Sequence, residues 1–344
     1  MYHLVTGACG YVGSNIVEEL VKQGFKVISL DILKNERITN ISKFYEIDVS
    51  NFDELLKITE DIDVIHHNAA LVPLTKSGKK YFQVNTIGTR NIINFALKKK
   101  VKHLSHMSSS AIFSKKLSNN NIDITEYKPI DIYGVSKYLA ELEIIKSINK
   151  LKERNTSYSI IRPRTIIGKG RLGIFSILFD WIKDDKKIPI IGDGNNLFQF
   201  AHVSDIVDVS IETSVKRISG FFNIGVKEFG TIKEDLNNFF KIVNSKSRVL
   251  PLNEKLAIFF LVIFDKLKVS PLSAWHYLSY SQTYYYDLEN TFKILEWRPK
   301  YSNIDLLKNA YHDYLLKLND QKQYGSAHKT DPKQKILKII KLFM

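Results

Sequence analysis

The strongest constraint on the fold is a strand, a glycine loop and a helix start that follow one another at the N-terminus. Residues 2–6 form a short apolar run, and residues 7–13 (Gly-Ala-Cys-Gly-Tyr-Val-Gly) lead from it into the helical apolar spacing of residues 16–21. Glycines permit a tight turn and let the backbone approach a pyrophosphate, whose charge then lies over free N–H groups at the helix N-terminus. The spacing is Gly-x-x-Gly-x-x-Gly, and such a loop alone could be only a tight turn. Its position between a strand and a helix predicts a nucleotide site.

The next predicted strand ends in a carboxylate that bears on the choice of nucleotide. Residues 26–31 end in Asp31, at roughly the offset from the glycine loop expected for an acid that binds ribose. Asp31 would accept hydrogen bonds from the ribose hydroxyls and repel a 2′-phosphate. This favours NAD over NADP, while Lys34 and Arg37 close behind it leave NADP as an alternative.

A tyrosine and a lysine four residues apart form a candidate proton-transfer pair. Tyr133 and Lys137 would share one face of a helix, with the serine run 108–110 upstream in the chain. A free phenol ionises near pH ~10, and an adjacent fixed cation makes tyrosine a more usable base. The pair suits proton removal from an alcohol, although a lysine stem packed under a ring is the alternative reading of the same spacing.

Further motifs follow in order and carry a resemblance to a known family. From Tyr2 to about Leu318, the chain resembles the extended short-chain dehydrogenases/reductases of the NAD-dependent epimerase/dehydratase family. Besides the Tyr-Lys pair and the glycine loop, the matching segments are Asp48-Val49, Asn68-Ala69-Ala70, Val84-Asn85-Thr86-Ile87-Gly88-Thr89, Ser108-Ser109-Ser110, Arg162-Pro163 and Phe200-Ala201-His202-Val203-Ser204-Asp205. Seven motifs in sequence order are far more specific than any one of them.

The resemblance implies a set of site residues. In this family Ser110 would hydrogen-bond the reacting oxygen, Tyr133 would act as the base, and Lys137 would lower the tyrosine pKa and hold the nicotinamide ribose. Ser108, Ser109, Arg162 and His202 are interpreted as structural. The implied NAD contacts are Gly7, Gly10, Tyr11, Val12, Gly13, Asp31, Ile32, Asp48, Val49, Asn68, Ala69, Ala70, Leu71, Asn85, Tyr133, Lys137 and Pro163.

The resemblance also implies the fold and the division of the chain. We expect an α/β fold, a Rossmann-like doubly wound parallel sheet with a smaller, interleaved C-terminal substrate lobe. Residues 1–165 would form the NAD-binding domain, to which segments near 200–210 and 221–230 return. Residues 166–318 would form most of the substrate lobe, and residues 319–344 a basic amphipathic tail. By analogy, the helices in 79–100 and 133–149 would pair across a homodimer.

Positions that distinguish family subtypes leave the substrate open. Sugar-nucleotide 4,6-dehydratases carry Asp-Glu directly after the catalytic Ser/Thr, where this chain has Ala111-Ile112, so dehydration is not expected. Epimerases of UDP-hexoses carry an Asn and two Arg that clamp the pyrophosphate, where this chain has Thr165, Phe198 and roughly residues 281–283. Either other cations replace the clamp, or the substrate is not an ordinary soluble nucleotide sugar. The nearest candidate cations are Arg164, Lys169 and Arg171. Together with Ser110 they are the predicted substrate contacts.

Charge and hydropathy patterns raise the question of a membrane. The net charge is +14, and six lysines lie after Asp320. On a helix, Ile336, Ile340 and Phe343 would share a face with Leu337 beside them, while Lys335, Lys338 and Lys341 would form another. Such a tail could lie on an anionic membrane, or it could pack on its own protein. The apolar run 256–264 is too short to span a bilayer and would pack in the substrate lobe or lie at an interface.

Other features exclude several classes. The one cysteine, Cys9, excludes an internal disulfide framework and fits a reducing compartment. His66 and His67 would point to opposite faces of a strand, and no ligand spacing accompanies them, so no metal site is expected. No recognition motif supports nucleic-acid binding. With no signal peptide or 20-residue apolar run expected, the protein should be cytoplasmic, with a peripheral place at the inner face of the membrane as a further option.

These observations support one leading function and two alternatives. The leading hypothesis is an NAD-dependent epimerase that transiently oxidises a hydroxyl of a sugar carried on a diphosphate, linked to a nucleotide or a polyprenyl chain. One alternative is a dehydrogenase or reductase of a sugar or hydroxysteroid-like alcohol with net NADH turnover. The other is a non-catalytic NAD-binding sensor or scaffold, for which loss of Ser110, Tyr133 or Lys137 would be expected.

Overall fold

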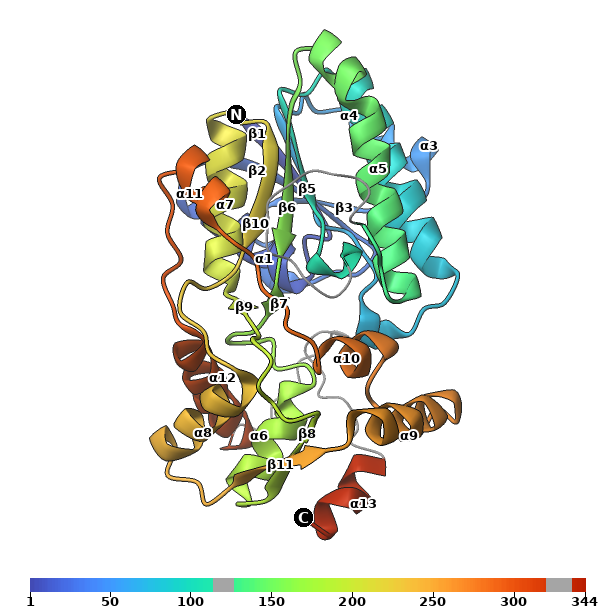
Figure 1. Cartoon of the computed structure of the whole chain (residues 1–344). Coiled ribbons are helices and arrows are strands. Elements are labelled where there is room, and N and C mark those ends of the chain that lie inside the picture. The colour runs from blue at the N-terminus through green and yellow to red at the C-terminus, as the bar shows by residue number, and fades with distance from the viewer. Residues whose placement is uncertain (114–126, 320–335) are drawn as a thin grey trace.

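A parallel sheet forms the centre of the upper lobe. The computed structural model describes residues 1–113, 127–319 and 336–344 (Figure 1). In this part of the chain seven strands pair in the order β10-β6-β5-β4-β1-β2-β3, and every pairing is parallel. Their bounds are β1 Tyr2–Thr6, β2 Lys26–Asp31, β3 Lys43–Glu46, β4 Val64–His67, β5 His103–Met107, β6 Ser157–Pro163 and β10 Gly220–Ile224. The predicted α/β class is confirmed.

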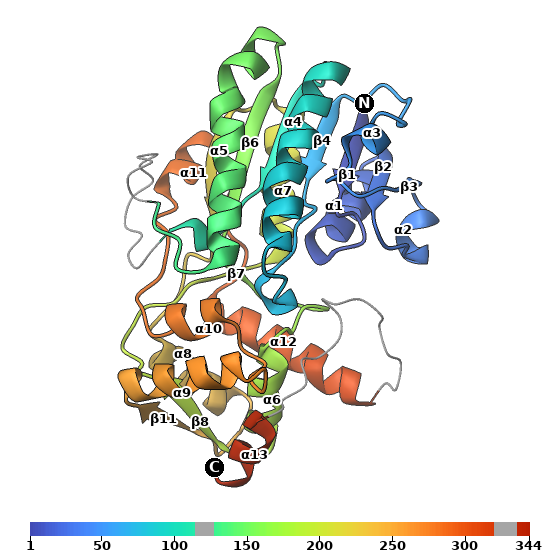
Figure 2. The ribbon, with the colours of Figure 1, turned by 90° about the vertical axis from the view of Figure 1, so that its right-hand side faces the viewer.

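Helices cover both faces of this sheet. On one face α1 (Tyr11–Lys22) packs beside α7 (Val203–Val215), and on the other α4 (Gly88–Lys99) packs beside α5 (Ile132–Glu153) (Figures 1 and 2). Burial on both faces places even polar strand residues, such as His66 on β4 and His103 on β5, in the interior. The short helices are α2 Glu36–Thr39 and α3 Phe52–Leu55, and a π-helical segment, Phe82–Ile87, leads into α4. The homodimer expected through α4 and α5 stays a prediction.

The chain leaves the sheet after β6 and returns to it. Strand β10 pairs with β6 in register from Gly220–Ser159 to Ile224–Pro163, and α11 (Glu289–Ile294) packs against β10. A two-stranded parallel pair, β7 (Thr165–Ile166) with β9 (Phe200–Ala201), lies where the chain passes between the lobes. The two lobes are therefore interleaved in sequence.

The lower lobe is built mainly of helices around a second small sheet. Strand β8 (Lys187–Ile191) pairs in parallel with β11 (Arg248–Leu252). The helices are α6 Phe175–Lys183, α8 Ile232–Ile242, α9 Glu254–Lys266, α10 Ala274–Ser279, α12 Asn303–Asn319 and α13 Ile336–Leu342 (Figure 2). None of the described helices is long and apolar enough to cross a membrane.

Residues 336–344 pack on the lower lobe, and the prediction of which residues form their apolar face is partly wrong. In α13, Leu337 and Ile340 pack against the core, as does Met344 behind the helix, whereas Phe343 is 84 % exposed. Lys341 lies inward and forms ion pairs with Asp180 and Asp184. Lys341 faces inward because Asp180 on α6 and Asp184 just after that helix are its charged partners, whereas Phe343 lies beyond the end of α13. Lys335 lies outside the described residues.

Candidate functional site

A deep cleft lies at the carboxyl ends of the central strands, where a doubly wound sheet binds its ligands. Its volume is about 680 Å³, and it extends from the glycine loop past Tyr133 to α10. Most residues predicted for the site line it, whereas Asn85 and Lys169 do not. The predicted residues in the lining are Gly7, Gly10, Tyr11, Val12, Gly13, Asp31, Ile32, Asp48, Val49, Asn68, Ala69, Ala70, Leu71, Ser110, Tyr133, Lys137, Pro163, Arg164 and Arg171.

The glycine loop is shaped to bring backbone close to a ligand. Gly7 has a φ of +64°, and a Cβ at this position would lie 2.7 Å from the backbone nitrogen of Ala69. A Cβ on Gly13 would lie 2.1 Å from the Gly7 carbonyl oxygen. Only glycine fits at either place, so α1 can begin directly over the end of β1 with its first N–H groups facing the cleft. This is the backbone cradle that a pyrophosphate requires.

Asp31 lies at the end of β2, next to this cradle. Its carboxylate accepts hydrogen bonds from the backbone N–H groups of Cys9, at 2.9 Å, and Leu33, at 3.1 Å. The two nearby cations face carboxylates of their own, because Lys34 pairs with Glu46 at 3.3 Å and Arg37 pairs with Glu18 at 2.5 Å. Both ion pairs are exposed and therefore weak, so the carboxylate of Asp31 is what favours NAD over NADP at this position.

Replacing Asp31 with asparagine should weaken this discrimination. Asparagine can still accept the Cys9 N–H bond, but it removes the negative charge that repels a 2′-phosphate. We expect the ratio of the NADP to the NAD dissociation constant to fall by at least about tenfold, a change of roughly 1.4 kcal/mol. Calorimetric titration of both cofactors measures this, with Asp61→Asn at an exposed site as the matched control. An unchanged ratio would remove the role given to Asp31.

Tyr133 enters the cleft from the first turn of α5. Asp131 caps this helix by accepting the Gly134 N–H at 2.8 Å. A Cβ on Gly134 would lie 2.3 Å from the Ala111 carbonyl oxygen, so glycine lets the helix start lie directly on the turn Ser110–Ile112. Tyr133 and the serine run are thereby brought together from segments more than twenty residues apart in the sequence.

Burial, a neighbouring serine and an arginine act on the pKa of Tyr133. Burial raises the pKa of Tyr133 to about 12, while a hydrogen bond with the Ser109 side chain and the charge of Arg171 lower it. Lys137 is not among the described groups that affect this pKa, and its Nζ donates to the Met107 carbonyl. The expectation that Lys137 lowers the tyrosine pKa stays a prediction, and in this structure the ammonium is directed at a backbone oxygen.

Lys137 itself is held in a state that can exchange protons near neutrality. It is buried at the end of β5, and burial lowers the pKa of its ammonium to about 8, although the Glu141 carboxylate acts in the opposite direction. An amine with a pKa near the working pH can both donate and accept a proton. Lys137 and Tyr133 both line the cleft, so the amine could exchange protons at the site.

Ser110 is held by an arginine that sequence reasoning assigned to the substrate. The guanidinium of Arg164 donates to Ser110 Oγ at 3.0 Å and to the Tyr284 carbonyl at 2.7 Å. It lies 3.9 Å from the ring centre of Tyr284 and is only 1 % exposed. Arg164 therefore positions the serine from behind, although it also borders the cleft.

A buried ion pair supports the serine run from below. Glu141 on α5 pairs with Arg162 on β6 and accepts a hydrogen bond from Ser108 Oγ at 2.7 Å. Tyr127 donates its hydroxyl to the same carboxylate at 2.9 Å. Because each charge is buried with a partner, this network fixes α5 against β5 and β6. Ser108 and Arg162 have the structural surroundings expected for them.

The remaining predicted residues divide between the cleft and its surroundings. Asn85 uses its side chain to bind the backbone of Leu71 and the hydroxyl of Ser136, so it shapes the loop after β4 from outside the cleft. Arg171 lies in the cleft with its guanidinium 5.4 Å from the ring centre of Tyr11. Lys169 is exposed. Among the described residues, no group of three or more His, Cys, Asp or Glu could hold a metal ion.

Sequence reasoning missed the residues at the substrate end of the cleft. Ser109 was interpreted as structural, yet it contacts the Tyr133 hydroxyl. Trp275, His276 and Tyr280 on and after α10 line the cleft, but they come from a region without recognisable motifs. Only the position of Ser109 next to Ser110 could have signalled its role.

Comparison with known proteins agrees with this geometry. Residues 3–225 match the model of the NAD dependent epimerase/dehydratase family. The chain is 32 % identical over 340 residues to an uncharacterised protein of Sinorhizobium fredii, covering 98 % of this chain and 85 % of the relative. It is 31 % identical over 224 residues to a putative UDP-glucose 4-epimerase of Methanocaldococcus jannaschii, covering 60 % of this chain and 72 % of the relative.

A solved structure extends the comparison to the fold. The UDP-glucuronic acid 4-epimerase of Bacillus cereus, determined with UDP-glucuronic acid and NAD, superposes with a TM-score of 0.72 at 25 % identity. The match covers 92 % of this chain and 100 % of that one. The resemblance read from the sequence is confirmed.

Proposed function

The chain belongs to the NAD-dependent epimerase/dehydratase family, whose cofactor is NAD, and we propose that it epimerises a sugar carried on a diphosphate. The observation that carries this proposal is the meeting of Tyr133, Ser109 and Ser110 in the same cleft as the glycine cradle and Asp31. A dinucleotide bound over the cradle extends along the strand ends toward Tyr133. The reactive tyrosine and the cofactor site are therefore parts of one continuous cleft.

The chemistry proposed for this chain is proton transfer at an alcohol. When bound, NAD accepts a hydride from the carbon that carries the reacting hydroxyl. Tyr133 takes the hydroxyl proton, and Ser109, which contacts the phenol, lowers the pKa of that tyrosine. Ser110, held by Arg164, donates a hydrogen bond to the oxygen on which charge develops. Return of hydride to the other face of the ketone, with the proton passing back from Tyr133 to the oxygen, would give the epimer and restore NAD.

The surroundings of Ser110 support epimerisation over dehydration. Ala111 and Ile112 follow it in a tight turn and are both fully buried. Elimination of water needs an acid and a base at the neighbouring carbon. These two apolar side chains supply neither at the place where 4,6-dehydratases carry theirs.

A diphosphate carrier is supported by a cation in the cleft. Arg171 lines the cleft, and within the described residues no side-chain hydrogen bond or ion pair involves its guanidinium. Such a guanidinium matches two phosphate oxygens. Phe198 replaces the arginine of UDP-hexose epimerases and stacks on Arg164, with 5.0 Å between guanidinium and ring centre. Arg171 is therefore the candidate for the missing pyrophosphate clamp.

Turnover with NAD and defined sugars tests the proposal. Purified protein incubated with NAD and UDP-glucose, UDP-glucuronic acid or polyprenyl-diphosphate sugars should produce an isomer without net NADH. Because two of the proteins named above are described as a putative and a structurally solved 4-epimerase, the C4 isomer is the first to examine. Chromatography identifies the sugar, and near-ultraviolet absorbance reports NADH. Stoichiometric NADH would instead indicate a dehydrogenase, and NAD binding without any conversion would indicate a sensor.

A further inference from the structure

The lower lobe contains a second cavity with an almost entirely apolar lining. Its volume is about 520 Å³, within the range of small-molecule sites. The walls come from α6, β8, α9 and α13, with side chains such as Trp181, Ile190, Phe264 and Ile340. The one carboxylate in the lining, Asp235, is bound by Asn303 at 2.7 Å and by the Gly230 N–H. A ligand in this cavity would meet hydrocarbon on nearly every side.

This cavity adjoins the substrate end of the catalytic cleft. Four residues line both spaces: Ile174, Phe175, His276 and Tyr280. The start of α6 and the short helix α10 therefore lie where the two spaces adjoin. One molecule with a polar head and an apolar tail could place the head near Tyr133 and the tail in the second cavity.

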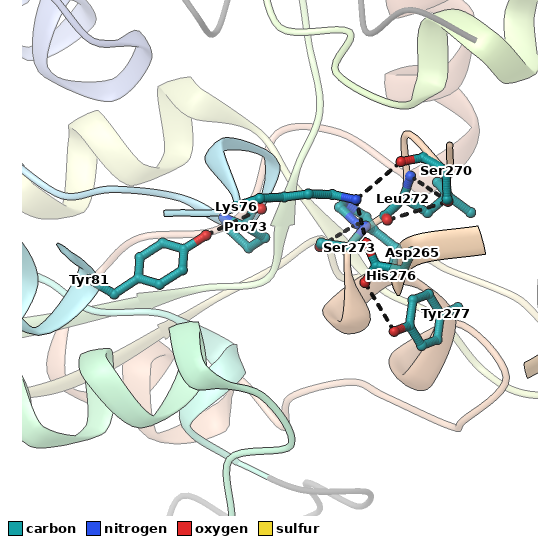
Figure 3. A network of polar contacts seen from close by, with 9 residues as sticks. All are labelled: Pro73, Lys76, Tyr81, Asp265, Ser270, Leu272, Ser273, His276 and Tyr277. Carbon is teal, nitrogen blue, oxygen red and sulfur yellow. Dashed lines mark hydrogen bonds and ion pairs between the residues drawn. The ribbon is translucent and has the colours of Figure 1, made fainter. Parts of the chain in front are cut away.

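A polar network holds α10 in place. Lys76, in the loop after β4, pairs with Asp265 of α9 and donates to the Ser270 carbonyl at 3.1 Å. Tyr277 donates to the same carboxylate at 3.2 Å, and His276 is bound to Ser273 (Figure 3). These contacts join the cofactor lobe to α9 and α10, so the position of the second cavity relative to the cleft is fixed.

The outer wall of the cavity presents apolar side chains to solvent. None of the thirteen residues of α9, all of them described, is buried, and Leu256 and Phe259 are 60 % and 58 % exposed. On α13 and just after it, Leu342 and Phe343 are 76 % and 84 % exposed. In both views α13 lies just below α9, and the Ile336 N–H donates to the carbonyl of Val269, which follows α9 (Figures 1 and 2). Large apolar side chains exposed on two neighbouring elements make this surface a candidate contact site for a partner.

Lysines accompany the exposed apolar side chains of α9 and α13. The sequence 320–335 contains no Leu, Ile, Val, Met, Phe or Trp. Basic residues accompany the apolar ones, since Lys255 and Lys338 are exposed on the same two helices. Apolar side chains flanked by lysines are the composition of surfaces that lie in an anionic membrane interface.

We propose that the second cavity holds the hydrocarbon tail of a lipid-linked substrate, and that α9 and α13 lie in the membrane surface that supplies it. This inference rests on the proposed function, because it places the sugar-bearing head of that substrate beside Tyr133. In this proposal the diphosphate of the substrate is attached to a lipid rather than to a nucleoside.

Binding of a short-tailed probe tests the cavity independently of turnover. The probe is glucose joined through a diphosphate to farnesol, and its control is the same compound with methanol in place of farnesol. Each buried methylene contributes about fourfold in affinity, so we expect the farnesyl compound to bind at least about a hundredfold more tightly. Calorimetry in the Tyr133→Phe variant with NAD present separates the two proposals. Equal affinity for both compounds overturns the tail site, whereas tail-dependent binding without turnover by the native enzyme overturns only the function.

Two neighbouring substitutions on α9 locate the tail. Leu261 lines the cavity, whereas Val262 beside it in the same described helix lies outside the lining. Leu261→Trp should lower the affinity for the farnesyl compound at least about tenfold, and Val262→Trp should leave it unchanged. Unaltered NAD binding shows that both variants are folded. Equal effects of the two substitutions would overturn the placement of the tail.

Vesicle binding tests the outer surface. Co-sedimentation with vesicles of phosphatidylglycerol and phosphatidylethanolamine should fall several-fold in the double variant Leu342→Ser and Phe343→Ser. Ile242→Ser, an exposed apolar position on α8, is the matched control and should bind as the native protein does. Vesicle binding that is absent in the native protein, or unchanged in the double variant, would overturn the membrane contact.

Discussion

Replacing Tyr133 with phenylalanine should reduce turnover by about 10² to 10⁴-fold, the usual contribution of a general acid or base. The substitution removes one hydroxyl and keeps the ring, which packs against Tyr81 with 5.9 Å between ring centres. NAD binding should persist, because the glycine cradle and Asp31 do not depend on the phenol. Initial rates and calorimetric NAD titration measure the two effects separately.

A second tyrosine on the same helix provides the control. Tyr138 lies one turn further along α5, outside the cleft lining, and its ring packs on Tyr127 at 5.1 Å. Tyr138→Phe should retain nearly full activity and full NAD binding. If Tyr133→Phe were as active as Tyr138→Phe, the proton-transfer mechanism would be excluded.

Lowering the pH from 7 to 5 should destabilise the protein by about 5 kcal/mol or more. The reason is a group of five buried histidines in the central strands: His3 on β1, His66 and His67 on β4, and His103 and His106 on β5. Burial lowers the pKa of His3 to about 4 and those of His67 and His103 to about 3. Burial also holds the pKa values of His66 and His106 well below the ordinary value.

The direction of the effect follows from proton binding in the two states. These histidines bind fewer protons in the folded protein than in the unfolded chain, where the pKa is about 6.5. Their contribution to stability is therefore complete above pH 6.5 and is lost as the pH falls, at about 2 kcal/mol for each histidine between pH 7 and pH 5. Burial raises the pKa of Asp205 to about 7. Protonation of Asp205 therefore stabilises the folded state as the pH falls, and this offsets the loss from about one histidine. The net loss is comparable with the total stability of a domain, about 5 to 15 kcal/mol.

Neighbouring charges modify this behaviour without reversing it. Asp63 raises the pKa of His3, whereas Lys137 lowers those of His67 and His106, and Arg217 lowers that of His103. In each case burial is the larger cause. Acid should therefore unfold the sheet well above the pH at which the carboxylates are neutralised.

Urea unfolding at pH 7, 6 and 5 and constant ionic strength measures the effect. His66→Gln should reduce the dependence of stability on pH by about one proton, because the variant lacks one of the buried imidazoles. His312→Gln removes an exposed histidine and should leave the dependence as it is in the native protein. Midpoints that stay level or rise toward pH 5 would show that the five histidines are not held neutral.

The features that could be predicted from the sequence are those set by local backbone requirements. Gly7 and Gly13 can be recognised because their positions exclude a side chain, and Asp31 because a strand end fixes its distance from the glycine loop. The alternation of strands and helices along the chain likewise indicates the parallel sheet. Such signals lie within a few residues of one another and need no knowledge of tertiary packing.

The features that escaped prediction depend on contacts between distant segments. Arg164 is directed at Ser110 because Tyr284, more than a hundred residues later, supplies its second acceptor. Lys341 faces inward because it pairs with Asp180 on α6 and with Asp184 just after that helix. Likewise α10 closes the substrate end of the cleft from a region whose sequence has no periodic pattern. Spacing along the chain carries no record of such partners.

The central claim is that this chain passes a hydride from an alcohol carbon to NAD and back while Tyr133 moves the proton. The most direct measurement uses a sugar substrate deuterated at the oxidised carbon, with the product examined by mass spectrometry in ordinary water. The account predicts that the isomer retains its deuterium and that no net NADH accumulates, since the hydride never reaches solvent. Loss of the deuterium to water would contradict it, because that result requires proton abstraction from carbon rather than hydride transfer.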